Sequence, residues 1–173
     1  MAFEHLSQVC RLTLCFETNI LIDYSERACL ADFGLHTFAS DPTNAVISSF
    51  SQIWGTVRWR SPELLDPDQF NAKDGRPTKE SDAYALGMVI LEVMSGNPPF
   101  KPFKDTVVTR MVLDEKQPER PYGPEGVRFG NGLWEMMQLC WKFDPENRAR
   151  IKDVLEFLEN ISSTWTPSNA RIL

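Results

Sequence analysis

The segment from Thr78 to Ser95 constrains the fold more than any other stretch of this sequence. It opens with a residue type that caps helices, and Gly96, which follows it, is a residue type that commonly ends them. Its apolar residues recur at helical spacing and lie nearly all round the helix: Ala83, Leu86, Val89, Ile90 and Val93. A helix of this kind is buried on most sides. The pattern therefore predicts a mainly helical fold built around this one helix.

Shorter patterns predict the elements around it. Two apolar pieces, 20–22 and 28–31, flank a polar turn and predict a small β-hairpin. Ser61 is expected to cap a short helix, because Pro62 suits the first helical position and Glu63 suits the first turn. Three further helices are predicted over 106–114, 132–143 and 151–161, with loops over 36–60 and 66–77.

Composition bounds the class of protein. With 173 residues, of which 42% are hydrophobic, the chain can bury one ordinary core, so a single globular domain is expected. The net charge of −6 and the lack of a basic run with aromatic residues exclude a general nucleic-acid surface. No apolar run reaches the roughly 20 residues that a membrane span needs.

The cysteines indicate the compartment. Cys10, Cys15, Cys29 and Cys140 form no CxxC pair, and with two histidines in the chain no zinc-ligand spacing arises. Scattered cysteines, in a chain whose first residues do not read as a secretory leader, favour a cytoplasmic or nuclear location.

Five motifs occur in order along the chain: Asn19-Ile-Leu, Asp32-Phe-Gly34, Gly55-Thr-Val-Arg-Trp-Arg-Ser-Pro-Glu63, Asp82-Ala-Tyr-Ala-Leu-Gly87 and Cys140-Trp-Lys-Phe-Asp-Pro-Glu-Asn-Arg148. Together they resemble the C-terminal lobe of a protein kinase, over residues 2–161. Residues 64–81 and 88–100 most resemble the tyrosine-kinase-like kinases that are numerous in fungi. The resemblance implies a helical core with a short β-hairpin that carries Asn19 and Asp32, and ATP-dependent phosphoryl transfer to protein.

The same resemblance divides the chain into three parts. Residues 1–16 are an atypical segment in the place of the helix before the catalytic loop, residues 17–161 are the kinase lobe, and residues 162–173 are a tail. The sequence contains no Gly-x-Gly-x-x-Gly loop and no strand lysine of the Val-Ala-Ile-Lys type, so the nucleotide-binding lobe is not encoded in these residues.

Asn19 and Asp32 are the predicted nucleotide and metal ligands. Phosphoryl transfer needs oxygen ligands for Mg²⁺, and an amide oxygen and a carboxylate supply them. The resemblance implies ATP and Mg²⁺ as cofactors, with weak or absent binding expected because half of the adenine pocket is not encoded. The simpler alternative is that Asp32 caps a turn and that Asn19 bonds within its own loop.

Position 14 departs from the family. Counting back from Asn19, the aspartate of the catalytic loop would stand where this sequence has Leu14, and Phe16 stands in place of the loop's lysine. Leucine can neither orient nor deprotonate a hydroxyl, and a general base contributes roughly 10²–10⁴ in rate. No catalytic residue is therefore assigned, and we expect the chain to be inactive in phosphoryl transfer on its own.

Residues 35–63 resemble the activation segment, which follows Phe33 and Gly34. Thr56 stands where tyrosine kinases usually carry proline, so the resemblance favours Ser/Thr substrates. Its other hydroxyls are either phosphorylation sites that order the loop or part of a solvated polar loop: Thr37, Ser40, Thr43, Ser48, Ser49 and Ser51.

Three charged residues are expected to have structural roles. The family pairs Glu63 with Arg148 in a buried bidentate contact that fixes the substrate-side loop, and it uses Asp82 to hold the backbone of the catalytic loop. Trp134 and Trp141, seven residues apart, are read as core residues of a helix and not as part of a cofactor site.

Two function classes compete. One is a protein Ser/Thr kinase domain represented by this lobe, and the other is a catalytically dead interaction module built on the same lobe. A third reading is an unstable fragment without function. Leu21 and Phe33 lie where the small lobe covers a complete kinase, so an apolar patch with a covering partner protein is expected.

Overall fold

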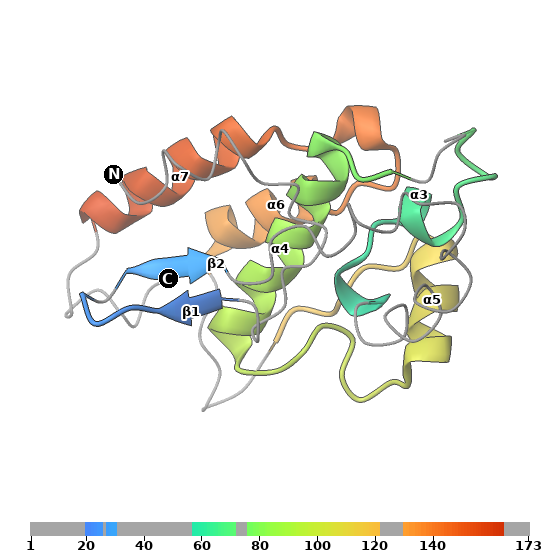
Figure 1. The fold of residues 1–173 in the computed structure, drawn as a ribbon, viewed down its shortest axis with the longest axis horizontal. Coiled ribbons are helices and arrows are strands. Elements are labelled where there is room, and N and C mark those ends of the chain that lie inside the picture. The colour runs from blue at the N-terminus through green and yellow to red at the C-terminus, as the bar shows by residue number, and fades with distance from the viewer. Residues whose placement is uncertain (1–19, 26, 31–56, 72–75, 122–129, 165–173) are drawn as a thin grey trace, which may run out of the picture.

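The computed structural model describes residues 20–25, 27–30, 57–71, 76–121 and 130–164. Their elements, in chain order, are β1 (Ile20–Ile22), β2 (Ala28–Leu30), the 3₁₀ helix η3 (Val57–Trp59), α3 (Pro62–Leu65), α4 (Lys79–Ser95), α5 (Asp105–Leu113), α6 (Asn131–Cys140), the 3₁₀ helix η4 (Pro145–Asn147) and α7 (Ile151–Thr164). The fold is mainly helical with one small sheet, as the sequence predicts (Figure 1).

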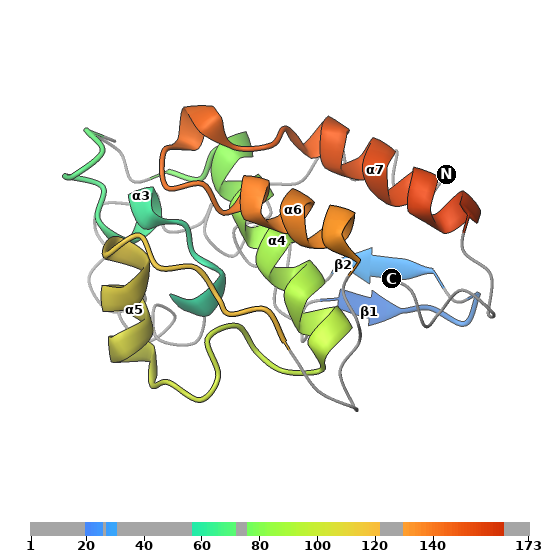
Figure 2. The same ribbon diagram turned by 180° about the vertical axis from the view of Figure 1, so that it is seen from behind.

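Helix α4 is the centre of this arrangement (Figures 1 and 2). The hydroxyl of Thr78 accepts a hydrogen bond from the amide of Ser81, and the hydroxyl of Ser81 accepts one from the amide of Thr78. This reciprocal capping box satisfies two amides that the first turn would leave free. At the other end Gly96 has a φ of 65°, the left-handed conformation that favours glycine, so both predicted ends of the helix are confirmed.

Helix α6 packs against α4 at Gly87. A Cβ atom at this position would stand 2.6 Å from the Trp141 Nε1 atom and 2.8 Å from the Cys140 Cβ atom, so only glycine fits without displacement. The core extends from this contact: it contains Val57, Trp59, Tyr84, Met88, Val89, Leu91, Phe100, Val108, Val112, Leu133, Met137, Cys140, Trp141 and Val154.

The two tryptophans belong to this core, as predicted. Trp141 is buried, and Trp134 packs against it edge to face, with 5.6 Å between the ring centroids.

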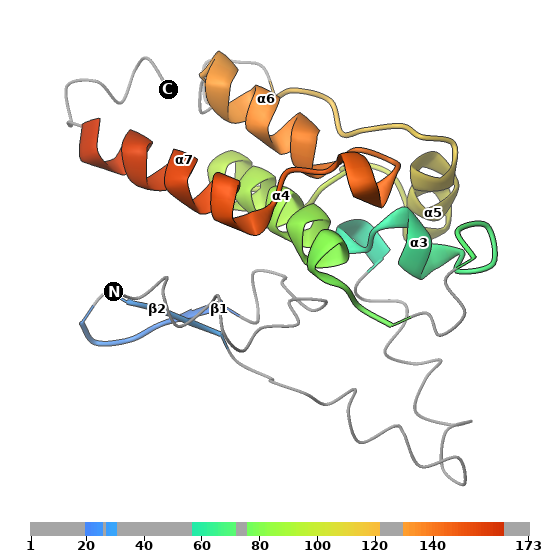
Figure 3. The same ribbon diagram turned by 90° about the horizontal axis from the view of Figure 1, so that it is seen from above.

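Strands β1 and β2 form the predicted hairpin. They are antiparallel, with Ile20 opposite Leu30 and Ile22 opposite Ala28. The carboxylate of Asp23 accepts hydrogen bonds from the amides of Ser25 and Arg27, which closes the turn. In Figure 3 the hairpin and α6 lie on opposite sides of α4.

Helices α3 and α5 contact each other at the end of the molecule away from the hairpin (Figures 1 and 3). Helix α5 begins at residue 105 and ends at 113, within one residue of its prediction, whereas α6 ends three residues before its predicted end and α7 continues three residues beyond. The predicted loop over 36–60 is wrong at 57–59, where the chain forms η3.

One predicted cap is also wrong in its chemistry. Ser61 occupies the N-cap position of α3 and Pro62 the first helical position, but the Ser61 hydroxyl makes no capping hydrogen bond. The hydroxyl is instead buried, with no partner among the described residues. No helix within the described ranges is long and apolar enough to cross a membrane.

Candidate functional site

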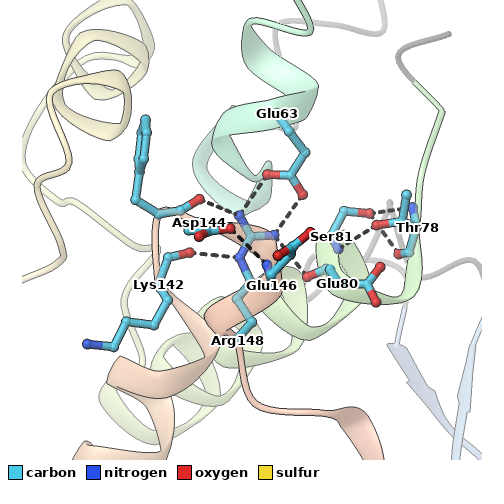
Figure 4. Close-up of polar contacts among 9 residues, drawn as sticks. Glu63, Thr78, Glu80, Ser81, Lys142, Asp144, Glu146 and Arg148 are labelled. Carbon is cyan, nitrogen blue, oxygen red and sulfur yellow. Dashed lines mark hydrogen bonds and ion pairs between the residues drawn. The ribbon is translucent and has the colours of Figure 1, made fainter. Parts of the chain in front are cut away.

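Glu63 and Arg148 form a buried ion pair, as predicted (Figure 4). The Nη1 and Nη2 atoms of Arg148 donate to the two carboxylate oxygens of Glu63, each at 2.7 Å. The same guanidinium donates to three backbone carbonyls: from Nε to Lys142 at 2.8 Å, from Nη1 to Glu80 at 3.0 Å and from Nη2 to Phe143 at 3.1 Å. All five N–H groups of the guanidinium are therefore used.

The Arg148 guanidinium also lies over the ring of Tyr84, 5.2 Å from its centroid. Tyr84 belongs to α4 and is buried, and this burial raises the pKa of its phenol well above the ordinary value. The aromatic face and the Glu63 carboxylate together hold a cation whose side chain is 0% exposed. The short helix α3 is thereby attached to the central helix and to the chain before α7.

A second set of contacts holds the segment just before α3. The indole Nε1 of Trp59 donates to the Glu92 carboxylate at 3.0 Å, and Glu92 is only 5% exposed. Arg58 donates from Nη1 to the carbonyl of Pro99 at 2.8 Å and pairs through Nη2 with the carboxylate of Asp105 at 2.9 Å. Residues 57–63 are thus fixed to α4 and α5 at one end and to Arg148 at the other. We call them the substrate-side segment, after the position that the family resemblance predicts for them.

Sequence reasoning missed this second set. The signal was present in α4, because Glu92 is a carboxylate within the apolar stretch 83–94 and a buried carboxylate needs a donor. Trp59 could have been named as that donor, since an indole N–H that is buried seeks an acceptor. No comparable signal joins Arg58 to Asp105, which lie 47 positions apart in the sequence.

Asp82 lies in the first turn of α4 and is 2% exposed. The catalytic-loop backbone that it is predicted to hold is outside the described residues, so this role stays a prediction. The other predicted site residues are also outside the described part of the chain: Leu14, Asn19, Asp32, Phe33, Gly34 and Thr56.

Within the described ranges, no group of three or more His, Cys, Asp or Glu side chains gathers as a metal site. The predicted ligands are adjacent in sequence to the hairpin. Ile20, the first residue of β1, pairs with Leu30, the last residue of β2. The start of β1 and the end of β2 are therefore neighbours.

The family model of protein tyrosine and serine/threonine kinases matches residues 14–158. The chain belongs to the protein kinase family. Its mainly helical structure with one small hairpin is that of the C-terminal lobe of a kinase domain, in agreement with the sequence prediction.

Three relatives illustrate this kinship. The rat receptor-interacting serine/threonine-protein kinase 3 is 31% identical over 152 residues, which cover 83% of this chain and 30% of the relative. The dual specificity protein kinase pyk3 of Dictyostelium discoideum is 30% identical over 166 residues, covering 95% of this chain and 11% of the relative. The rat TGF-beta receptor type-2 is 28% identical over 160 residues, which cover 80% of this chain and 27% of the relative. The chain spans less than a third of the length of each.

Proposed function

We propose that the chain is the C-terminal lobe of a protein Ser/Thr kinase domain whose helical scaffold is intact but which cannot transfer a phosphoryl group on its own. One observation carries the proposal: position 14, where the family's catalytic aspartate stands, is leucine. A hydrocarbon side chain can neither accept the proton of a substrate hydroxyl nor orient that hydroxyl.

The contacts around the substrate-side segment support the scaffold part of the proposal. Its two ends are held by the buried Glu63–Arg148 pair and by the Trp59–Glu92 hydrogen bond. A segment fixed in this way keeps its shape in the absence of a ligand, which lowers the entropic cost of binding one. The lobe therefore serves as a rigid platform for a protein segment.

The class of acceptor follows from Thr56 and from the relatives. Thr56 stands where tyrosine kinases usually have proline. Two relatives carry serine/threonine or dual specificity in their names. We infer that the protein partner presents Ser or Thr hydroxyls to this face.

Asn19 and Asp32 fit Mg²⁺ by the chemistry of their donors, because a carboxylate and an amide oxygen are hard ligands. In the proposal they hold the metal ion of Mg²⁺·ATP, beside the paired end of the hairpin. When bound, the nucleotide supplies the phosphoryl group and the metal neutralises its charge. The chain's own part is to bind the metal-bound phosphates, and it binds them weakly because these residues are the only part of the nucleotide site assigned in the sequence.

A second candidate function is a pseudokinase module that binds a partner protein. The observation that favours it is the exposed hairpin, where the apolar side chain of Leu21 is 55% exposed. A partner that covers this strand would bury the exposed apolar surface. Both candidates divide the chain in the same way, into an N-terminal segment (1–16), the lobe (17–161) and a tail (162–173).

Both candidates place the lobe in a reducing compartment of the cell. Cys29 and Cys140, the cysteines within the described residues, are both free. A cytoplasmic or nuclear location is consistent with these thiols.

Titration of the 173-residue chain with Mg²⁺·ATP tests the proposal through the unfolding temperature. We expect no saturating rise at low micromolar nucleotide, and a smaller response from Asp32→Ala than from the unchanged chain, because the variant lacks one of the two proposed metal ligands. Asp68→Ala, which removes a carboxylate from an exposed position, is the matched control. A rise that saturates at low micromolar nucleotide and that Asp32→Ala alone abolishes would contradict the weak binding that we propose.

A further inference from the structure

Arg60 is the one charged residue of the substrate-side segment whose charge is not balanced within the described residues. Arg58 pairs with Asp105 and Glu63 pairs with Arg148. Arg60 is partly buried, and no hydrogen bond or ion pair joins its guanidinium to any residue of the described ranges. Its Nε atom is fully shielded from solvent and has no acceptor there.

This arrangement costs free energy in the unbound protein. A guanidinium that is partly withdrawn from water loses hydration, and no carboxylate of the described residues replaces it. Burial accordingly lowers the pKa of the Arg60 guanidinium. An anion that entered from the exposed side would recover that cost, because charged hydrogen bonds are stronger where water is partly excluded.

The backbone around Arg60 is already fixed for such a contact. The residue before it, Trp59, is held through its indole by Glu92, and Glu63, three residues after it, is held by Arg148. The Arg60 amide donates to the carbonyl of Val57, which closes the η3 turn. Since the segment is held on both sides, little backbone order has to be gained when a ligand binds.

The surface beside the segment fits a peptide. Helix α5 contacts η3, and two large apolar side chains are exposed there: Phe103, just before α5, is 44% exposed, and Val107 is 43% exposed. Arg58 donates to the carbonyl of Phe103, which places that residue next to the segment. Exposed apolar side chains beside a segment that carries a cation without a partner among the described residues suit a protein segment with an acidic side chain.

We propose that Arg60 binds the carboxylate of an acidic residue in the protein segment that docks on this face. The inference deepens the proposed function, because it names the chemistry that the substrate-side segment selects. A carboxylate matches the site better than a phosphate does, because the neighbouring cation, Arg58, is already neutralised by Asp105. One guanidinium without a partner among the described residues balances one carboxylate, whereas a phosphate carries up to two charges at neutral pH.

Binding of labelled peptide pools to the 173-residue chain, without nucleotide, tests this proposal. Each peptide has one central Ser or Thr, and the flanking positions carry Asp and Glu in one pool, Asn and Gln in a second, and phosphoserine in a third. We expect the acidic pool to bind about tenfold more tightly than the amide pool, as one or two charge-assisted hydrogen bonds provide. The preference should decrease as salt is added, because part of the site is exposed.

Arg60→Met should abolish the preference, whereas Arg60→Lys should keep a reduced one because the charge remains. The matched control is Arg150→Met, which removes an arginine whose side chain is 82% exposed and should leave the preference intact. The unfolding temperature of Arg60→Met should equal or exceed that of the unchanged chain, because methionine carries no uncompensated charge.

Equal binding of the acidic and amide pools, or a preference that survives Arg60→Met, would overturn the proposal. Tighter binding of the phosphoserine pool than of the acidic pool would overturn it in favour of a phosphate site. Because the assay contains no nucleotide, its outcome is independent of whether the chain transfers phosphoryl groups, so failure of this inference and failure of the proposed function are distinguishable.

Discussion

Arg148 and Glu63 lie 85 positions apart in the sequence, yet the two Nη atoms of one meet the two carboxylate oxygens of the other at 2.7 Å (Figure 4). The contact joins α3 to the chain between α6 and α7 and crosses the start of α4, whose Glu80 carbonyl accepts a further hydrogen bond from Arg148. This pair therefore ties the substrate-side segment to the helical core.

Glu63→Gln should destabilise the chain strongly. The substitution leaves the Arg148 guanidinium buried without its counter-charge, which typically costs about 3–5 kcal/mol. Urea unfolding followed by circular dichroism measures the change. The control is Asp153→Asn, which removes the partner of the exposed Arg150 and should produce no measurable change.

Replacing both members of the buried pair at once separates the cost of an unpaired buried charge from the cost of the lost hydrogen bonds to backbone carbonyls. Glu63→Leu combined with Arg148→Met removes both charges, and we expect it to be more stable than Glu63→Gln alone. The carbonyls of Lys142, Glu80 and Phe143 then lose their donor, so full recovery is not expected. A double variant less stable than the single one would show that the carbonyl contacts, and not the ion pair, dominate.

Gly87→Ala should destabilise the chain by about 1–3 kcal/mol, in the range of overpacked core substitutions. The new Cβ would meet Trp141 Nε1 at 2.6 Å and Cys140 Cβ at 2.8 Å, and this conflict exceeds the gain in helix propensity. Gly132→Ala in α6 is the matched control, because its nearest neighbour, Phe157 Cζ, would be at 3.4 Å. Equal stabilities of the two variants would refute the close packing of α4 on α6.

Two helix starts give opposite predictions for the same type of change. Thr78→Ala removes a hydroxyl that accepts from the Ser81 amide and should cost about 1 kcal/mol. Ser61→Ala removes a buried hydroxyl without a partner among the described residues and should leave stability unchanged or raise it. Chemical denaturation of both variants under one condition provides the comparison. A loss at Ser61 as large as at Thr78 would mean that Ser61 is a functioning cap.

These two residues also illustrate what the sequence can predict. Helix α4 was predictable at both ends, because its cap, its apolar period and Gly96 are all local signals. Ser61 carries the same local signal at a helix start, but its hydroxyl is buried and makes no capping hydrogen bond. Local pattern thus predicts that a helix begins there, whereas burial in the tertiary fold decides what the side chain does.

The site was predictable where the family pattern assigns a partner. Glu63 and Arg148 were paired in advance because the resemblance names both. The Trp59–Glu92 and Arg58–Asp105 contacts were not foreseen, because each joins residues that only the tertiary fold brings together. That Arg60 has no partner among the described residues could likewise not be predicted, since a missing partner can be recognised only after the neighbouring residues are placed.

Alkaline pH should weaken the fold through Cys140. Burial raises the pKa of this thiol from 9.0 to about 12, so the unfolded chain ionises first as the pH rises. The neutral thiol contributes fully to the free energy of unfolding below pH 9.0. Between pH 9.0 and about 12 this contribution decreases, and the folding equilibrium constant decreases by close to tenfold for each pH unit. Urea unfolding just below pH 9 and at about pH 10 measures it.

Cys140→Ala isolates this effect, because the buried Tyr84 phenol, whose pKa is also raised, remains in the variant. The variant should lose less stability than the unchanged chain over the same pH interval. Thiol labelling with mass spectrometry adds a check: Cys29 is exposed and should react in the folded chain, whereas Cys140 should react only as the chain unfolds. Labelling of both at equal rates would contradict the burial of Cys140.

Phosphoryl transfer by the 173-residue chain is the most direct test of the proposed function. The purified chain is incubated with γ-labelled ATP, Mg²⁺ and a Ser/Thr-containing protein acceptor, with Asp32→Ala as the paired variant. The account predicts no labelled acceptor above the level given by Asp32→Ala, because Leu14 cannot serve as the base. Transfer that the unchanged chain performs and that Asp32→Ala abolishes would contradict it.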